Sequence, residues 1–254
     1  MLHDFRKDKF DIIIQAGQSN SEGWSFGLAD EPYQRDERVW YLNQDRTISI
    51  AAESAVNNGI QSNFALSFAR EYLRAERLVG DRRLLIIRAA VGGTSFLGNR
   101  WGLEDDLYLQ MMDMTRTALE LNPENRLVAL LWHQGESDAI AGASYDVHYK
   151  NLRTLLCELR DTFAAPALPF VAGDFVYHWK DRNTEACAPV IEAIRAVCRD
   201  FSNCKFVESD GLLSNSQAND YHPLGWTEDP IHFSRNSIYE LGKRYFAAFC
   251  DICG

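Results

Sequence analysis

The chain has 254 residues, of which 46% are hydrophobic and 24% charged, so it can bury a substantial core and is neither disordered nor fibrous. Its 26 Lys and Arg residues against 36 Asp and Glu residues give a net charge of −10. This acidity, without any basic run, argues against a nucleic-acid partner and an anionic-membrane surface. No apolar stretch approaches the roughly 20 residues that span a bilayer. The charged start shows no signal peptide, so we expect a soluble, cytoplasmic protein.

Six cysteines are sparse for this length, which favours reduced thiols over a disulfide scaffold. Cys250 and Cys253 form a C-x-x-C pair at the end of the chain. A metal or redox site would need a second ligand pair or a turn after a strand, and the sequence supplies neither. We expect two thiols on a terminal helix.

Strand-like and helix-like segments alternate along the chain. The short hydrophobic runs typical of buried strands are 10–16, 38–42, 84–90, 127–132, 169–175 and 205–208. Amphipathic stretches with helical spacing lie between or after them, at 64–78, 145–163 and 238–249. Gly80 is the expected C-cap of the first of these helices, and Ser234 the expected N-cap of the last.

This alternation predicts a parallel sheet covered on both faces, which is a three-layer α/β/α sandwich. No repeat, low-complexity segment or linker divides the chain, so we expect one domain over residues 1–254. Open parallel sheets bind ligands beyond the carboxyl ends of their strands. The segments that follow the strands are therefore where functional residues are expected.

Ser19 follows the first strand, in the segment Gly17-Gln18-Ser19-Asn20. A serine hydroxyl becomes an effective nucleophile only when a neighbouring base accepts its proton. The alternative role for this serine is a helix N-cap. The segment lacks the second glycine of the G-x-S-x-G elbow, which disfavours the usual α/β-hydrolase arrangement.

His232 is the histidine best placed to be that base, because Asp229 precedes it by three residues. This spacing lets the carboxylate hold one ring nitrogen while the other faces the serine. His222 lies in a polar stretch typical of a surface loop, and His148 lies in a helical stretch without a special neighbour. Ser19, His232 and Asp229 together form a candidate triad.

Hydrolysis of an ester builds negative charge on the carbonyl oxygen, so the site also needs oxyanion donors. Gly92-Gly93, after the strand at 84–90, can present a backbone N–H, and Ser19 can offer its own. Gln134, after the strand at 127–132, can offer a side-chain N–H. The alternative roles are a simple turn for the two glycines and a surface amide for Gln134. Glu136 is expected to support the neighbouring loop rather than to act as a catalytic acid.

Taken together, four segments resemble the SGNH/GDSL hydrolase superfamily. They are Gly17-Gln18-Ser19-Asn20, Ala-Val-Gly-Gly-Thr at 90–94, Trp-His-Gln-Gly-Glu-Ser-Asp at 132–138, and Asp229-x-x-His232-Phe233. Within the superfamily the chain is most similar to carbohydrate esterases related to sialate O-acetylesterases and acetylxylan esterases (carbohydrate esterase family six). The matches run in order from residue 12 to residue 233, and the His-Gln-Gly-Glu block is the most specific of them.

The resemblance implies a flavodoxin-like sandwich with about five parallel strands and a serine esterase that needs no metal or cofactor. By position, Ser19 would be the nucleophile, His232 the base and Asp229 the residue that orients it. Ser19, Gly93 and Gln134 would donate to the oxyanion.

Five further residues are placed around this site, as support or as substrate contacts: Gln18, Asn20, Gly92, Glu136 and Trp101. Trp101, in the segment 96–102, is a candidate to stack on a pyranose ring, and its alternative role is to anchor that loop. One stretch departs from the family. Ser21-Glu22-Gly23-Trp24 stands where a Met-Ala-Gly-like stretch is usual, and it borders the expected pocket.

The leading functional hypothesis is removal of O-acetyl groups from a small acetylated carbohydrate, either xylan-derived or a sialic acid, through an acyl-enzyme. A lipid or thioester hydrolase of the same superfamily is the alternative, and it would need an apolar acyl channel. A non-catalytic nucleotide or carbohydrate binder is the third. The nucleotide version lacks a phosphate loop, and a carbohydrate binder would have no need of a complete Ser/Asp/His/Gln set.

Overall fold

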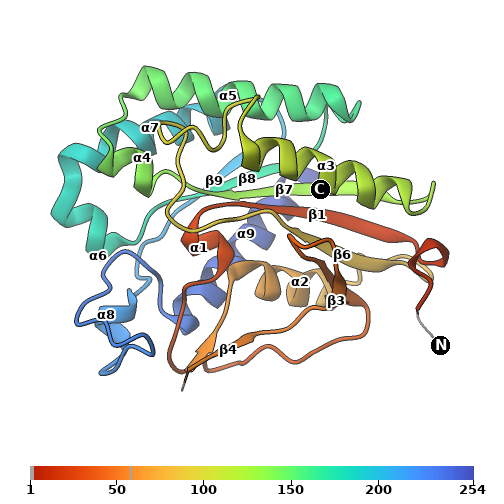
Figure 1. The fold of residues 1–254 in the computed structure, drawn as a ribbon, viewed down its shortest axis with the longest axis horizontal. Helices are drawn as coiled ribbons and strands as arrows, with labels where there is room; N and C mark the ends of the chain where they lie inside the picture. Colours follow the sequence, from red (N-terminus) through yellow and green to blue (C-terminus); the bar gives the residue numbers. More distant parts are fainter. Residues whose placement is uncertain (1–2, 58) are drawn as a thin grey trace.

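The structure, a computed structural model, describes residues 3–57 and 59–254. Within these residues a seven-stranded sheet runs through the centre of the molecule (Figure 1). From one edge to the other its strands are β3 (Ile48–Ile50), β2 (Val39–Leu42), β6 (Arg83–Arg88), β1 (Phe10–Gly17), β7 (Arg126–His133), β8 (Phe170–Gly173) and β9 (Cys204–Val207). Of these described strands all but β3 run parallel, and β3 pairs antiparallel with β2. The sheet is therefore larger than the expected five parallel strands, because all six predicted hydrophobic runs join it.

Helices cover both faces of the sheet (Figure 1). The helices α2 (Phe64–Arg74) and α9 (Arg235–Cys253) pack together on one face. The other face carries α3 (Asp106–Glu120), α5 (Tyr145–Thr162) and α7 (Thr184–Asp200). The predicted three-layer α/β/α sandwich is confirmed. Among the described helices, none is both long and apolar enough to cross a bilayer.

Short elements lie at the ends of the main ones. They are α1 (Ser19–Glu22), α4 (Glu136–Ile140), α6 (Tyr177–Lys180), α8 (Asn215–Ala218), the 3₁₀ turns η1 (Phe5–Lys7) and η2 (Asp181–Asn183), and the β4 (Ser54–Val56) and β5 (Gly59–Gln61) hairpin. Of these, α1 begins two residues after the end of β1, and α4 begins three residues after the end of β7. Both short helices therefore begin at the carboxyl edge of the sheet, where parallel sheets bind ligands.

The central strand β1 is buried along its whole length, including the polar side chains of Asp11 and Gln15 that flank its three isoleucines. It ends at Gly17, which pairs with His133 of β7 and has a φ of +123°. A Cβ atom at this position would lie 2.1 Å from the carbonyl oxygen of His133. Only glycine allows the two strands to approach so closely while the chain turns into α1. The segment that carries Ser19 therefore begins at a fixed point on the sheet.

Two predicted helix ends have different outcomes. Ser234 caps α9, and its hydroxyl accepts a hydrogen bond from the N–H of Ser237, which confirms the first. The expected C-cap at Gly80 is wrong, because α2 ends at Arg74. Glu76 takes a left-handed backbone conformation (φ 53°) and turns the chain out of the helix before Gly80 is reached.

Candidate active site

Ser19 is the first residue of α1, and Gln18 is the N-cap. The backbone N–H of Gln18 donates to the carbonyl oxygen of His133 over 2.9 Å. Its side-chain Oε1 accepts from the N–H groups of Gly135 (3.3 Å) and Ser137 (3.1 Å). Gln18 thereby ties the turn after β1 to the turn after β7.

The hydroxyl of Ser19 meets His232 at the base of a pocket. Ser19 Oγ lies 2.9 Å from His232 Nε2, and His232 Nδ1 lies 2.7 Å from Asp229 Oδ1. A carboxylate only accepts, so Nδ1 carries the ring proton and Nε2 is free to accept the proton of the serine. All three side chains are buried, although they come from opposite ends of the chain. This is the geometry that a Ser-His-Asp triad requires.

Asp229 is held by donors on both carboxylate oxygens. Asn215 Nδ2 donates to Oδ2 over 2.7 Å, and His222 Nε2 lies 3.1 Å from the same oxygen. Burial raises the pKa of Asp229, but the hydrogen bond and charge of His232, with the donors Asn215 and His222, outweigh it and leave the pKa below its usual value. The carboxylate is therefore ionised when His232 needs it.

The surface-loop interpretation of His222 is wrong. Its side chain is only 7% exposed, and its ring stacks on that of Trp226 with centroids 4.7 Å apart. The polar residues around it predicted a solvated loop, but the chain folds this loop back onto Asp229. The local sequence does not predict the contact between His222 and Asp229, because the two residues are seven positions apart in a loop.

Two backbone N–H groups at this pocket, those of Ser19 and Gly93, are the candidates for oxyanion donors that the sequence indicated. Gly93 lines the same pocket as Ser19 and has a φ of +69°, a conformation that favours glycine. Neither the Gly93 N–H nor the Ser19 N–H donates to an acceptor within the residues that the structure describes. The N–H of Gly92, in contrast, donates to Glu22 Oε2 over 2.7 Å.

Gln134 lies behind the pocket and not in it. Its side chain is fully buried, and Nε2 donates to Asp138 Oδ2 over 2.6 Å and to the carbonyl oxygen of Thr94 over 3.4 Å. The surface-amide alternative is wrong, since no part of the residue is exposed. The structure brings Ser19 and Gly93 together, but it directs the amide N–H groups of Gln134 to other acceptors.

Trp101 does not line the pocket. It is fully buried and packs edge-on against Trp132, with ring centroids 5.1 Å apart. Its Nε1 donates to Thr94 Oγ1 over 3.0 Å. A sugar cannot stack on a ring with no exposed face, so the structure contradicts the stacking role and supports the loop-anchoring alternative.

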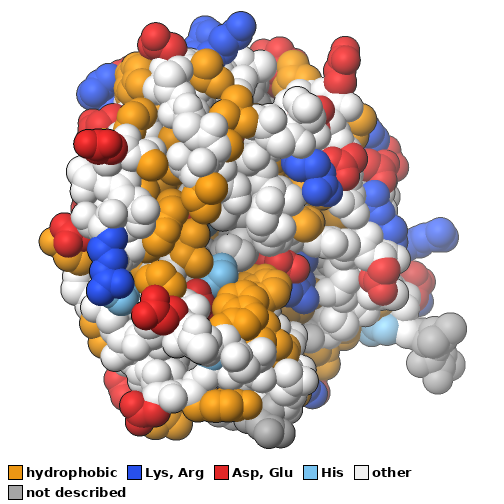
Figure 2. All heavy atoms as spheres, turned by 60° about the vertical axis from the view of Figure 1, so that its left-hand side comes forward, with side chains coloured by type: hydrophobic (Ala, Val, Ile, Leu, Met, Phe, Trp, Pro, Cys, Tyr) orange, Lys and Arg blue, Asp and Glu red, His pale blue; other side chains and the backbone are white. Residues whose placement is uncertain are grey.

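The pocket above Ser19 has a volume of about 550 Å³. It is lined by Gln18, Ser19, Glu22, Trp24, Val91, Gly92, Gly93, Ser137, Ile140, Trp226, Ile231 and His232. This side of the molecule faces the reader in Figure 2, where hydrophobic, acidic and histidine side chains meet around a hollow. Glu22 and Trp24 line the pocket, in agreement with the expectation that the segment 21–24 borders it. Trp226 was not identified from the sequence as a site residue.

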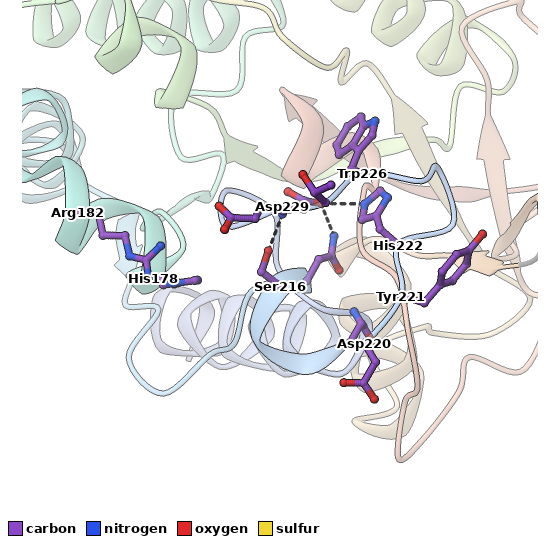
Figure 3. Close-up of a pocket in the computed structure, with 12 residues that line it drawn as sticks. His178, Arg182, Ser216, Asp220, Tyr221, His222, Trp226 and Asp229 are labelled. Carbon is purple, nitrogen blue, oxygen red and sulfur yellow. Dashed lines mark hydrogen bonds and ion pairs between the residues drawn. The ribbon is translucent and has the colours of Figure 1, made fainter.

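A second cavity of about 320 Å³ lies next to this pocket and shares Trp226 with it (Figure 3). Asp229 and His222 line its inner side, and His178 and Arg182 approach from α6 and the following turn. Asp220 and Glu228 also line it, so carboxylates outnumber the one arginine. Trp226 therefore lines both cavities, whereas Asp229 lines only the second.

Residues 9–251 match the family model described as carbohydrate esterase, sialic acid-specific acetylesterase. The chain belongs to this family. Its members are the carbohydrate esterases that the four sequence segments resemble, so the resemblance is confirmed.

One curated relative is similar to part of this chain. A protein of Escherichia coli (strain K12) described as a probable 9-O-acetyl-N-acetylneuraminic acid deacetylase is 30% identical over 99 residues, which cover 35% of this chain. The matched segment spans only 29% of that relative.

Solved structures show the same fold over nearly the whole chain. NanS matches with a TM-score of 0.82 at 19% identity, covering 96% of this chain and 97% of NanS. An Arabidopsis thaliana protein matches with a TM-score of 0.74 at 21% identity, covering 95% and 98%. A carbohydrate acetylesterase from Xanthomonas citri matches with a TM-score of 0.62 at 15% identity, covering 95% of this chain and 56% of the esterase.

Proposed function

We propose that this member of the family is a serine esterase that removes O-acetyl groups from carbohydrates, with O-acetylated sialic acids as its substrates. The observation that carries the proposal is the line of contacts from Ser19 Oγ through the His232 ring to Asp229, with distances of 2.9 and 2.7 Å. The family description and the named activity of the Escherichia coli relative support the substrate class.

In the first half of the reaction, Ser19 Oγ attacks the acetyl carbonyl carbon while its proton passes to His232 Nε2. The carbonyl oxygen becomes an oxyanion that accepts hydrogen bonds from the N–H groups of Ser19 and Gly93. Asp229 stabilises the imidazolium that has formed. The tetrahedral intermediate then collapses, and the departing sugar oxygen takes the proton from His232. The products of this half are the free sugar hydroxyl and acetyl-Ser19.

In the second half, a water molecule attacks the acetyl-Ser19 carbonyl, and His232 accepts one of its protons. The same two backbone donors receive the second oxyanion. Collapse of this intermediate breaks the bond to Ser19 Oγ, which regains its proton from His232, and acetate leaves. No residue changes its role between the halves, because water replaces the sugar hydroxyl at the same position.

The proposal is tested by measuring acetate released from O-acetyl sialic acids and from acetylated xylo-oligosaccharides, with Ser19→Ala as the background control. A series of p-nitrophenyl esters from acetyl to octanoyl measures the acyl preference. We expect the highest kcat/KM on the acetylated sialic acids and a decline with acyl length. A preference for octanoyl over acetyl would identify a lipid-type hydrolase, and a preference for xylo-oligosaccharides would overturn the substrate class.

A further inference from the structure

Three aromatic rings form a continuous stack beside the catalytic residues. The ring of His222 stacks on Trp226 with centroids 4.7 Å apart and planes 9° apart. Trp226 in turn stacks on Trp24 at 5.6 Å and 13°. Trp226 is therefore the middle ring of the three and contacts both His222 and Trp24. Trp226 is 43% exposed and lines both cavities. We call His222, Trp226 and Trp24 the aromatic stack.

One end of the stack is anchored to the triad. The N–H of Leu224 donates to His222 Nδ1 over 3.2 Å, so this nitrogen carries no proton in the neutral ring. The proton is therefore on Nε2, which lies 3.1 Å from Asp229 Oδ2. His222 thus donates to the carboxylate oxygen that His232 does not use.

The other end is anchored to the glycine turn. Trp24 Nε1 donates to Glu22 Oε2 over 2.9 Å, and the same oxygen accepts the N–H of Gly92 over 2.7 Å. Gly93, which lines the pocket and whose N–H has no acceptor among the described residues, is the next residue.

We propose that the aromatic stack is a positioning device that ties the triad carboxylate to the oxyanion side of the site, with His222 as the positioning residue for Asp229. Four donors, the ring and backbone N–H of His232 with His222 and Asn215, leave Asp229 one orientation, and the stack prevents His222 from leaving it. His222 acts through Asp229 and does not itself touch the reacting atoms. The kinetic part of the proposal rests on the proposed esterase function, whereas the geometry of Asp229 does not.

Two substitutions separate the hydrogen bond of His222 from its ring. His222→Phe keeps a ring that stacks on Trp226 but removes the donor to Asp229. His222→Gln keeps an N–H donor at about the position of Nε2 but removes the ring. Tyr221→Ala changes an exposed residue of the same loop, 61% exposed and outside the stack, and is the matched control.

With p-nitrophenyl acetate we expect His222→Phe to lower kcat about tenfold or more, with KM within about twofold, because a hydrogen bond to a charged group is lost and no substrate contact is. His222→Gln should recover most of this loss, and Tyr221→Ala should match the wild type. Equal losses in His222→Phe and His222→Gln, or an unchanged kcat in His222→Phe, would overturn the role of the hydrogen bond.

A second measurement does not depend on turnover. The proton on His232 Nδ1, between the ring and Asp229, is observable by NMR in the free protein. We expect its resonance to shift in His222→Phe and to return towards the wild-type position in His222→Gln. Should the wild type hydrolyse no acetyl ester, the proposed function fails while this resonance still tests the stack. An identical resonance in all three proteins would overturn the positioning role.

Discussion

Asn20 donates a hydrogen bond to Glu136 across the carboxyl edge of the sheet, with 2.7 Å between Nδ2 and Oε1 and both side chains fully buried. The same amide also donates to the carbonyl oxygen of Ile231 (3.0 Å), and its Oδ1 accepts from the N–H of Phe233 (3.1 Å). Asn20 therefore holds the backbone on both sides of His232.

Glu136 is ionised in this position. Burial raises its pKa, but the neighbouring His133 ring, with Nε2 3.4 Å from Oε1, and the Asn20 amide outweigh it and leave the pKa below its usual value. The expected supporting role of Glu136 agrees with this contact, because the carboxylate fixes Asn20 and through it the loop that carries His232.

Asn20→Ala should lower both stability and activity. The change removes three buried hydrogen bonds and leaves the Glu136 carboxylate without one of its donors, so the free energy of unfolding should fall by about 2–3 kcal/mol. The backbone on both sides of His232 loses its hydrogen bonds to Asn20, so His232 should be less well positioned and kcat should fall more than KM changes. Denaturant unfolding and steady-state kinetics on one acetyl ester measure the two effects. Wild-type kinetics in a destabilised variant would show that Asn20 supports the fold alone.

Ser19→Ala should abolish hydrolysis of p-nitrophenyl acetate while the thermal midpoint stays close to that of the wild type. The reason is chemical, since no acyl-enzyme can form without Oγ, and the hydroxyl caps no helix in this fold. Activity and thermal unfolding are measured on the same preparation. Retention of as much as a tenth of the activity would rule out the serine mechanism.

Gln134→Ala should act mainly on stability. In the structure its amide donates to Asp138, and that carboxylate also accepts from the N–H groups of Phe96 and Leu97. Loss of one buried donor should lower the free energy of unfolding by about 1–3 kcal/mol and loosen the loop after β6.

The resemblance predicts a different result for the same variant. An oxyanion donor would lose about 10²–10³ in kcat with an unchanged thermal midpoint and KM. Kinetics and thermal unfolding of Gln134→Ala, with Gln134→Glu beside it, therefore decide which role the residue has.

His148 should make the protein less stable as the pH falls from about 6.5 to 4. Burial lowers its pKa to about 4, although Asp138, 3.6 Å from Nδ1, acts in the opposite direction. Between its unfolded and folded pKa values the unfolded chain binds a proton that the folded protein does not, so stability rises with pH in this window.

His148→Phe should remove that part of the pH dependence. The free energy of unfolding is measured from pH 4 to 7.5 for both proteins, and the difference between the two curves isolates His148 from the carboxylates that titrate in the same range. Parallel curves would contradict a buried neutral histidine.

The site was predictable where local sequence is enough. Ser19 lies two residues after the end of β1, and Asp229 and His232 are three residues apart, so the end of a strand and one turn indicate where each of them lies. His148 and His222 could not be assigned in this way, because their partners, Asp138 and Asp229, lie ten and seven residues away across folded loops.

The sequence by itself determined the layered fold, because its short hydrophobic runs must be buried in a sheet that is covered on both faces. It also determined which segments follow the strands at the carboxyl edge of the sheet. Only the tertiary structure decided that Trp226 lines the pocket while Trp101 is buried in the core. The side chain of Trp101 is long enough to reach either the core or the solvent. It lies in the core, where it packs against Trp132 and donates a hydrogen bond to Thr94. Trp226 stacks on His222 and Trp24 because the loop formed by residues 219–228 packs against the segment that follows β1. Side-chain direction depends on such long-range neighbours, and a local pattern holds no information about them.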